Sequence, residues 1–167
     1  MQPKILIIED NPIVKKQLET ILAPVNVELH FTNSVKKALD LSRYMQFAVI
    51  MTDVHTPDSS GFTFINEFLR KTKPEEQYII LMNTNEDEAE NIIKAYNSGA
   101  VDYITKPFRA GIVRAKVDLF VRLYKKRKQI EDLLLNILPY SVSEEIRENG
   151  KAIPKRYGSA TIMFTDF

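Results

Sequence analysis

The chain has 167 residues, of which 44% are hydrophobic and 27% charged, and its formal net charge is +1. That length suffices for one domain with a buried core plus a smaller segment. Because the chain has no cysteine, disulfides, thiol nucleophiles and sulfur-ligated zinc sites are excluded. His30 and His55 are the only histidines, so a metal site would have to hold a hard cation through oxygen ligands.

The sequence predicts a cytoplasmic protein. It contains no apolar run long enough to span a membrane, and its amino terminus lacks the pattern of a secretory signal. Positive charge is local: residues 109–128 carry 8 basic and 1 acidic side chains, whereas residues 1–108 carry 11 and 15. Because the basic block is confined to one predicted helix, we expect neither nucleic acid nor a membrane as a partner.

Short apolar runs alternate with amphipathic stretches over the first 106 residues. Asn11-Pro12, Ser34 and Gly61 are typical of helix starts, and Gly99 is typical of a helix end. Ala89, Ile92, Ile93 and Tyr96 are expected on the inner face of the fourth helix. The five predicted strands are Lys4–Ile8, Val25–Phe31, Phe47–Thr52, Tyr78–Met82 and Val101–Ile104.

Five such units predict an α/β fold. Strands that are apolar on both faces must be covered on both faces, and right-handed crossovers then produce a doubly wound five-stranded parallel sheet. For the flavodoxin-like order 2-1-3-4-5, the ligand site lies beyond the carboxyl ends of strands one and three. The first of these strands ends at Glu9-Asp10 and the other at Asp53.

Three carboxylates at one sheet edge repel one another unless a cation lies among them. Mg²⁺ fits this composition, because it prefers oxygen ligands and is usually held by one or two carboxylates plus phosphate oxygens. A carboxylate beside such an ion can attack a phosphoryl group and hold it as an acyl phosphate. Lys106, which follows the fifth strand and precedes Pro107, is placed to reach across to that group.

Together these motifs resemble the receiver domain of bacterial two-component response regulators, over roughly residues 1–125. The matching segments, in family order and spacing, are Ile7-Ile8-Glu9-Asp10-Asn11, Met51-Thr52-Asp53 with Pro57 and Gly61, Gly99-Ala100 before Asp102-Tyr103, and Ile104-Thr105-Lys106-Pro107-Phe108.

The resemblance implies a role for each of these positions. Asp53 would be the phosphoacceptor, phosphorylated by a sensor histidine kinase, and Lys106 would pair with the phosphoryl group. Tyr103 would be the aromatic residue whose rotamer reports phosphorylation. The Mg²⁺ ligands implied by the family are Glu9, Asp10, Asp53 and the main-chain carbonyl of His55.

Simpler explanations stay open for several of these residues. Asp10 or Asn11 could serve only as a helix cap, Lys106 could be a solvated loop lysine, and Tyr103 could be a packing residue. Asn83 departs from the family pattern, which places Thr or Ser directly after the fourth strand, and the hydroxyl of Thr84 comes one residue later. Asparagine can donate a hydrogen bond through its amide, so we expect phosphorylation to survive while the switch is weakened.

A long helix follows the predicted domain. Residues 108–138 contain one glycine and no proline, and we expect them to form a coiled-coil linker that makes a homodimer; a helix folded back on its own domain is the alternative. The stripe at heptad positions consists of Ile112, Leu119, Leu123, Ile130, Leu133 and Ile137, with Lys116 and Lys126 in the same columns.

Residues 133–167 resemble the entry to class III adenylate and guanylate cyclases. The resemblance depends on the helical run LLLNILP and on a strand ending FTDF, where Asp166 corresponds to one of that family's two metal-binding aspartates. The sequence ends before the remaining catalytic residues of that family, and one strand cannot form a domain. We therefore expect residues 139–167 to be a truncated cyclase segment that cannot itself cyclise a nucleotide.

The sequence thus predicts a switch in which phosphorylation of Asp53 controls a dimeric nucleotide cyclase through the helix. The alternative is a receiver-like scaffold that is insensitive to phosphate and only dimerises the linker, and Asn83 favours it. A DNA-binding regulator is disfavoured because no helix-turn-helix pattern follows the domain.

Overall fold

The computed structural model describes residues 2–72, 80–85, 89–137 and 140–152, and positions 154, 156, 158, 159 and 161. The chain divides into two compact units, Met1–Gln129 and Ile130–Phe167. The predicted division into residues 1–125, 108–138 and 139–167 stays a prediction, and residues 138–139 and 162–167 lie outside the described residues.

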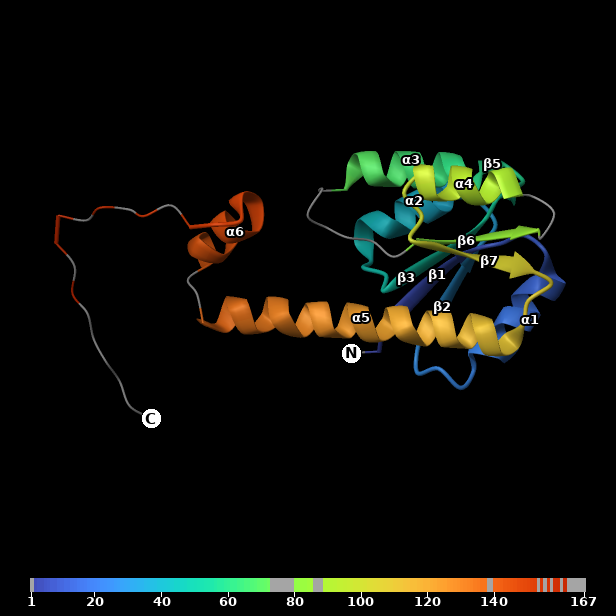
Figure 1. Cartoon of the computed structure of the whole chain (residues 1–167), viewed down its shortest axis with the longest axis horizontal. Helices are drawn as coiled ribbons and strands as arrows, with labels where there is room; N and C mark the ends of the chain where they lie inside the picture. Colours follow the sequence, from blue (N-terminus) through green and yellow to red (C-terminus); the bar gives the residue numbers. More distant parts are fainter. Residues whose placement is uncertain are drawn as a thin grey trace. The chain divides into compact units, whose positions relative to one another are not determined.

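The first unit is built on a five-stranded parallel sheet of order β2-β1-β3-β6-β7 (Figure 1). This order confirms the predicted doubly wound, flavodoxin-like fold, because β6 and β7 are the fourth and fifth long strands along the chain. The strands are β1 (Lys4–Ile8), β2 (Glu28–Thr32), β3 (Val49–Asp53), β6 (Ile80–Asn85) and β7 (Asp102–Lys106).

Helix α1 and residues 110–129 of α5 cover one face of the sheet, and α2, α3 and α4 cover the other (Figure 1). The core residues of β1 alternate between the faces: Leu6 and Ile8 pack towards α2 and α3, whereas Ile5 and Ile7 pack towards α1 and α5. The helices are α1 (Pro12–Leu22), α2 (Val35–Tyr44), α3 (Gly61–Lys71), α4 (Ala89–Asn97) and α5 (Ala110–Ile137), and the second unit contains α6 (Tyr140–Asn149).

Local chemistry sets the helix ends as the sequence predicts. The Asn11 side chain accepts hydrogen bonds from the amides of Ile13 and Val14, and the Ser34 side chain accepts one from the amide of Lys37. Gly99, which follows α4, has a φ of +102°, a conformation that favours glycine.

Two expectations about the elements need correction, and one element is additional. Strand β2 begins at Glu28 rather than Val25, because Val25 donates its amide to the Leu22 carbonyl in the turn that ends α1. In α4, Ile93 is 64% exposed and Tyr96 is 47% exposed, while the small residue Ala95 is buried against the sheet. A two-stranded antiparallel hairpin, β4 (His55–Thr56) and β5 (Ser59–Ser60), follows β3 and was not predicted.

Candidate functional site

Two acidic residues meet at the carboxyl ends of neighbouring strands. Glu9 directly follows β1, and Asp53 is the last residue of β3, which pairs with β1 in parallel. Because parallel neighbours end at the same sheet edge, their side chains converge. The Glu9 side chain is 1% exposed and that of Asp53 is 15% exposed, whereas Asp10 lies on the exposed surface.

Lys106 joins these two acids from the end of β7. Its Nζ atom lies 2.5 Å from Asp53 Oδ2 and 3.1 Å from Glu9 Oε2, so the side chain passes the end of β6 to reach both. Burial alone lowers the pKa of Lys106, but the hydrogen bonds and negative charges of Asp53 and Glu9 outweigh it and raise that pKa. Lys106 is therefore a fixed positive charge beside Asp53.

The main chain orients the Glu9 carboxylate. Its Oε1 atom accepts hydrogen bonds from the amides of Asp10 at 3.1 Å and Asn11 at 3.0 Å, which leaves Oε2 for Lys106. The same Asn11 caps α1 through its side chain. The Glu9-Asp10-Asn11 segment thus combines the start of a helix with the positioning of a buried acid.

Gly61 allows the chain to pass close to Asp53. A Cβ atom at this position would lie 2.2 Å from the Asp53 carbonyl oxygen and 2.9 Å from Thr52 Oγ1. The Gly61 amide donates to the Val54 carbonyl at 3.0 Å, which closes the hairpin that follows Asp53. The close approach accounts for glycine at this point of the motif.

Asn83 lies beside Asp53 on the next strand. The two residues are paired in register, and the Asn83 carbonyl accepts from the amide of Val54 at 3.2 Å. The Asn83 side chain is fully buried, and neither its Nδ2 nor its Oδ1 atom has a hydrogen-bond partner among the described residues. Such a group is costly to bury, so it is a candidate for binding an incoming ligand. For Thr84 the structure describes only the backbone, which pairs with Thr105.

Tyr103 occupies a separate cluster near the start of β7. Its half-buried ring makes an edge contact with the ring of Tyr96, with 5.9 Å between centroids, and Lys116 Nζ lies 5.3 Å from its centroid. Lys116 Nζ also bonds to Asp102 Oδ2 at 2.5 Å and to the Tyr103 carbonyl at 3.0 Å. Tyr103 therefore packs between α4 and α5, in the same strand as Lys106.

The predicted metal ligands are only partly brought together. Among the described residues, no three acidic or histidine side chains are grouped as metal ligands, and a lysine ammonium bridges Glu9 and Asp53. The donor chemistry nevertheless fits Mg²⁺, which prefers oxygen ligands. One ammonium does not neutralise two carboxylates, so negative charge remains on their oxygen atoms. The assignment of Glu9, Asp10, Asp53 and the His55 carbonyl as ligands stays a prediction. Asp166 lies outside the described residues.

Sequence reasoning missed Asp58, at the tip of the β4–β5 hairpin. Its carboxylate bonds to Ser34, Val35 and Lys36 at the start of α2. The only local signal for this tip is the Pro57-Asp58 pair, which is typical of turns. The partner helix lies more than twenty residues earlier, so no local pattern indicates the contact.

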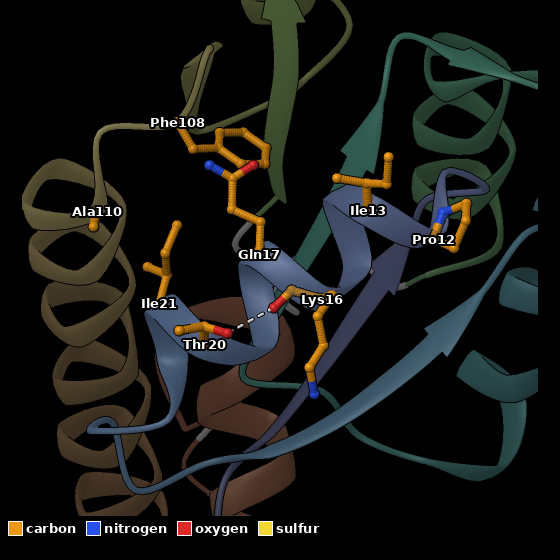
Figure 2. Close-up of a pocket in the computed structure, with 8 residues that line it drawn as sticks. All are labelled: Pro12, Ile13, Lys16, Gln17, Thr20, Ile21, Phe108 and Ala110. Atoms are coloured by element: carbon orange, nitrogen blue, oxygen red, sulfur yellow. Dashed lines mark hydrogen bonds between the residues drawn. The ribbon is translucent and has the colours of Figure 1, made fainter.

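An open groove of about 580 Å³ lies between α1 and the start of α5 (Figure 2). Its lining is mostly apolar, includes Ile13, Ile21 and Phe108, and contains one charged side chain, Lys16, and no acid. Ile13 is 76% exposed there. The groove has no group suited to phosphoryl transfer, so the acidic end of the sheet is the better candidate for that chemistry.

Comparisons with known proteins agree with this geometry. The response regulator receiver domain family matches residues 5–118. The regulatory protein VanR of Enterococcus faecium is 30% identical over 141 residues, which are 84% of this chain and 59% of that protein. The response regulator protein PilR of Pseudomonas aeruginosa is 30% identical over 72% of this chain and 26% of its own length. The chain thus spans about a quarter to three fifths of these relatives.

Solved structures share the fold. A two-component response regulator from Clostridium difficile superposes with a TM-score of 0.65 at 26% identity, covering 72% of this chain and 97% of that one. A BeF3-activated DrrB receiver domain superposes with a TM-score of 0.62 at 27% identity, covering 73% and 99%. Within the described residues, no helix has both the length and the apolar character needed to cross a membrane.

Proposed function

Because the chain belongs to the response regulator receiver domain family, we propose that Asp53 accepts a phosphoryl group from a sensor histidine kinase in a reaction that requires Mg²⁺. The observation that carries this proposal is the double contact of Lys106 with Asp53 and Glu9. It places a fixed positive charge beside one reactive carboxylate at the open end of a parallel sheet.

The chemistry is a displacement at phosphorus. A carboxylate oxygen of Asp53 forms a bond to the phosphorus atom, while the bond from phosphorus to the donor's imidazole nitrogen breaks and its electron pair stays on that nitrogen. Lys106 Nζ, 2.5 Å from Asp53 Oδ2, is close enough to pass from the carboxylate to a phosphoryl oxygen. This contact would stabilise the charge on the transferred group.

Glu9, Asp10, Asp53 and the main-chain carbonyl of His55 would hold Mg²⁺. When bound, the ion would offset the charge on the phosphoryl oxygens. The orientation of Glu9 by the amides of Asp10 and Asn11 supports this role, because a carboxylate held before the ion arrives loses less freedom on binding.

Asn83, Thr84 and Tyr103 would form the switch. The Asn83 amide is buried, is level with Asp53 and has no partner among the described residues, so a phosphoryl oxygen would give its Nδ2 an acceptor. Tyr103 would report this change to the surface of α4 and α5, where its ring contacts Tyr96 and Lys116.

The output of the switch would be a C-terminal class III nucleotide cyclase, controlled through a homodimer of the 108–138 helix. Helix α5 supports this proposal because it exposes apolar side chains at heptad spacing: Ile112, Leu119, Leu123, Ile130 and Leu133 are 46–59% exposed. Lys116 lies in the same heptad column but is bound to Asp102 and Tyr103, so its charge is partly compensated. Asp166 would be a metal ligand of that cyclase.

A phosphate-insensitive dimerisation scaffold is the second candidate, and one observation favours it. The position next to Asp53 that would couple phosphate to the switch is an asparagine, which has no hydroxyl group. In this case Asp53 would react slowly or not at all, and α5 would dimerise independently of phosphate.

Incubation with acetyl phosphate and MgCl₂, followed by intact-protein mass spectrometry, tests the proposal. We expect a gain of one phosphoryl group that needs Mg²⁺ and disappears in Asp53→Asn. Asp40→Asn is a control that removes an acid on α2, where Asp40 pairs with Arg43 of the same helix, while keeping Asp53. Absence of any gain in the wild-type chain would favour the scaffold.

A further inference from the structure

Asp58 fixes the tip of the hairpin that follows Asp53. Strands β4 and β5 pair His55 with Ser60 and Thr56 with Ser59, so Pro57 and Asp58 form the turn between them. Two strands of two residues each are not stable alone. The hairpin therefore needs anchors outside itself.

The start of α2 provides the anchor for the tip. Asp58 Oδ1 accepts a hydrogen bond from the Val35 amide at 3.0 Å, and Oδ2 accepts from the Ser34 hydroxyl at 2.8 Å and from the Lys36 amide at 3.4 Å. These amides belong to the first turn of a helix and have no partner within it. A carboxylate at this end also interacts favourably with the helix dipole.

The electrostatics agree with this contact. Burial alone raises the pKa of Asp58, but the hydrogen bonds from Val35, Ser34 and Lys36 outweigh it, and the pKa is lowered. Asp58 is therefore ionised at neutral pH, as an acceptor of three hydrogen bonds requires.

The anchor continues to the other side of the acidic site. The Ser34 amide donates to Thr32 Oγ1 at 3.3 Å, and the Thr32 carbonyl accepts from the Glu9 amide at 2.9 Å. Thr32 is buried. A continuous path of hydrogen bonds and short chain segments thus runs from Asp58 through Ser34 and Thr32 to Glu9.

The base of the hairpin has its own anchor. The Val54 amide donates to the Asn83 carbonyl at 3.2 Å, and the Gly61 amide donates to the Val54 carbonyl at 3.0 Å. Residues 55–60 are therefore held at their base by β6 and at their tip by α2. With both ends fixed, the main chain at His55 has a defined position relative to Glu9 and Asp53.

We propose that Asp58 is a positioning residue for the divalent cation at the acidic end of the sheet. By tying the hairpin to the start of α2, it holds the His55 main-chain carbonyl at the distance from Glu9 and Asp53 that a shared cation requires. This inference rests on the proposed function, because it assumes that a cation binds there. It adds a residue outside the set of predicted ligands.

The test compares Mg²⁺ affinity in four forms of the whole chain. MgCl₂ is titrated into wild type, Asp58→Ala, Asp58→Asn and Asp40→Ala, and binding is followed by the amide NMR signals of Glu9 and Gly61. Asp40 is the matched control, because it is an acid on α2 that pairs with Arg43 of the same helix. Asp40→Ala removes the same charge without releasing the hairpin.

We expect Asp58→Ala to raise the dissociation constant for Mg²⁺ about tenfold. This is the lower end of the loss in metal affinity seen when a group that orients metal ligands is removed. Asp40→Ala should match wild type. Asp58→Asn keeps an acceptor for the Val35 amide and should fall between wild type and Asp58→Ala. In the metal-free protein, amide hydrogen exchange at Val54 and Gly61 should be faster in Asp58→Ala than in Asp40→Ala.

A role limited to capping α2 would lower the unfolding midpoint of Asp58→Ala and leave its Mg²⁺ affinity unchanged, which would overturn this inference alone. If the wild-type chain binds no Mg²⁺, both this inference and the proposed function fail. Should Asp58→Ala not fold, Asp58→Asn decides, since wild-type affinity in that variant would also overturn the positioning role.

Discussion

Two lysine–aspartate contacts lie at the two ends of strand β7 and differ in their surroundings. In each, Nζ is 2.5 Å from Oδ2: Lys106 contacts Asp53 at the carboxyl end, and Lys116 contacts Asp102 at the amino end. Lys106 also contacts a second carboxylate, that of the buried Glu9, whereas the further partner of Lys116 is the neutral carbonyl of Tyr103.

This difference sets the contact that we propose for the phosphorylation site apart from a structural one. Two carboxylates and one ammonium leave excess negative charge that favours an additional cation, whereas a one-to-one pair is balanced. Close approach of lysine and aspartate is thus insufficient to identify chemistry. The count of charges around the pair, and its place at the end of a parallel sheet, distinguish the site from a structural contact.

Replacing each lysine in turn by alanine should give the largest difference in phosphorylation rate between the two contacts. We expect Lys106→Ala to slow phosphorylation of Asp53 by acetyl phosphate about a hundredfold, the cost of removing one donor to a developing charge. Lys116→Ala should react at close to the wild-type rate, because its ammonium contacts Asp102 and Tyr103. The rates are measured by intact mass against time. Equal slowing in both variants would show that the loss of charge acts through folding.

Two glycines should show how tightly each region is packed. Gly61→Ala places a methyl group 2.2 Å from the Asp53 carbonyl and should destabilise the fold by about 1–3 kcal/mol. Gly111, in α5, has no atom within 4 Å of an added Cβ, so Gly111→Ala should stabilise by up to about 1 kcal/mol. Urea unfolding measures both. A stable Gly61→Ala variant would contradict the close approach at Asp53.

The pH dependence of the unfolding free energy should show that the charged form of Lys106 stabilises the fold. Because the pKa of Lys106 is raised in the folded state, its stabilising contribution is complete below the unfolded pKa and is lost as pH rises through the folded pKa. The difference in unfolding free energy between wild type and Lys106→Met should be constant from neutral pH to about pH 10 and shrink above it. Because the tyrosines and the other lysines titrate in both proteins, their contributions cancel in the difference between the two unfolding free energies. A difference that instead grows with pH would contradict the assigned partners.

The sequence predicts well that acids gather at one end of the sheet, because the signals for this are local. Buried strands appear as apolar runs, and the acids that follow them must share an edge once the strand order is known. The contact of Lys106 with both Glu9 and Asp53 needs the register of four strands, which no single segment carries. The orientation of Glu9 rather than Asp10 into the site depends on main-chain amides at the start of α1.

The surface between α4 and α5 is predicted less well. A helical stripe of Ile93 and Tyr96 is expected to face the core, yet both are exposed, since the small Ala95 allows α4 to approach the sheet on a different face. The β4–β5 hairpin is also missed, because strands of two residues carry no periodicity. In both cases tertiary contacts decide the structure, and propensity gives little information.

The smallest expected effect concerns the balanced pair at the start of β7. The side chains of Asp102 and Lys116 are 21% and 29% exposed, so water and salt screen their attraction despite the short contact. A double-mutant cycle of Asp102→Asn and Lys116→Met, measured by urea unfolding, should give a coupling of at most about 1 kcal/mol that falls with added salt. A coupling near 3 kcal/mol that is insensitive to salt would mean that the pair behaves as a buried one. In that case solvent exposure would not separate the two ends of β7, and the pairs would differ in the excess carboxylate at Glu9 and in their place in the sheet.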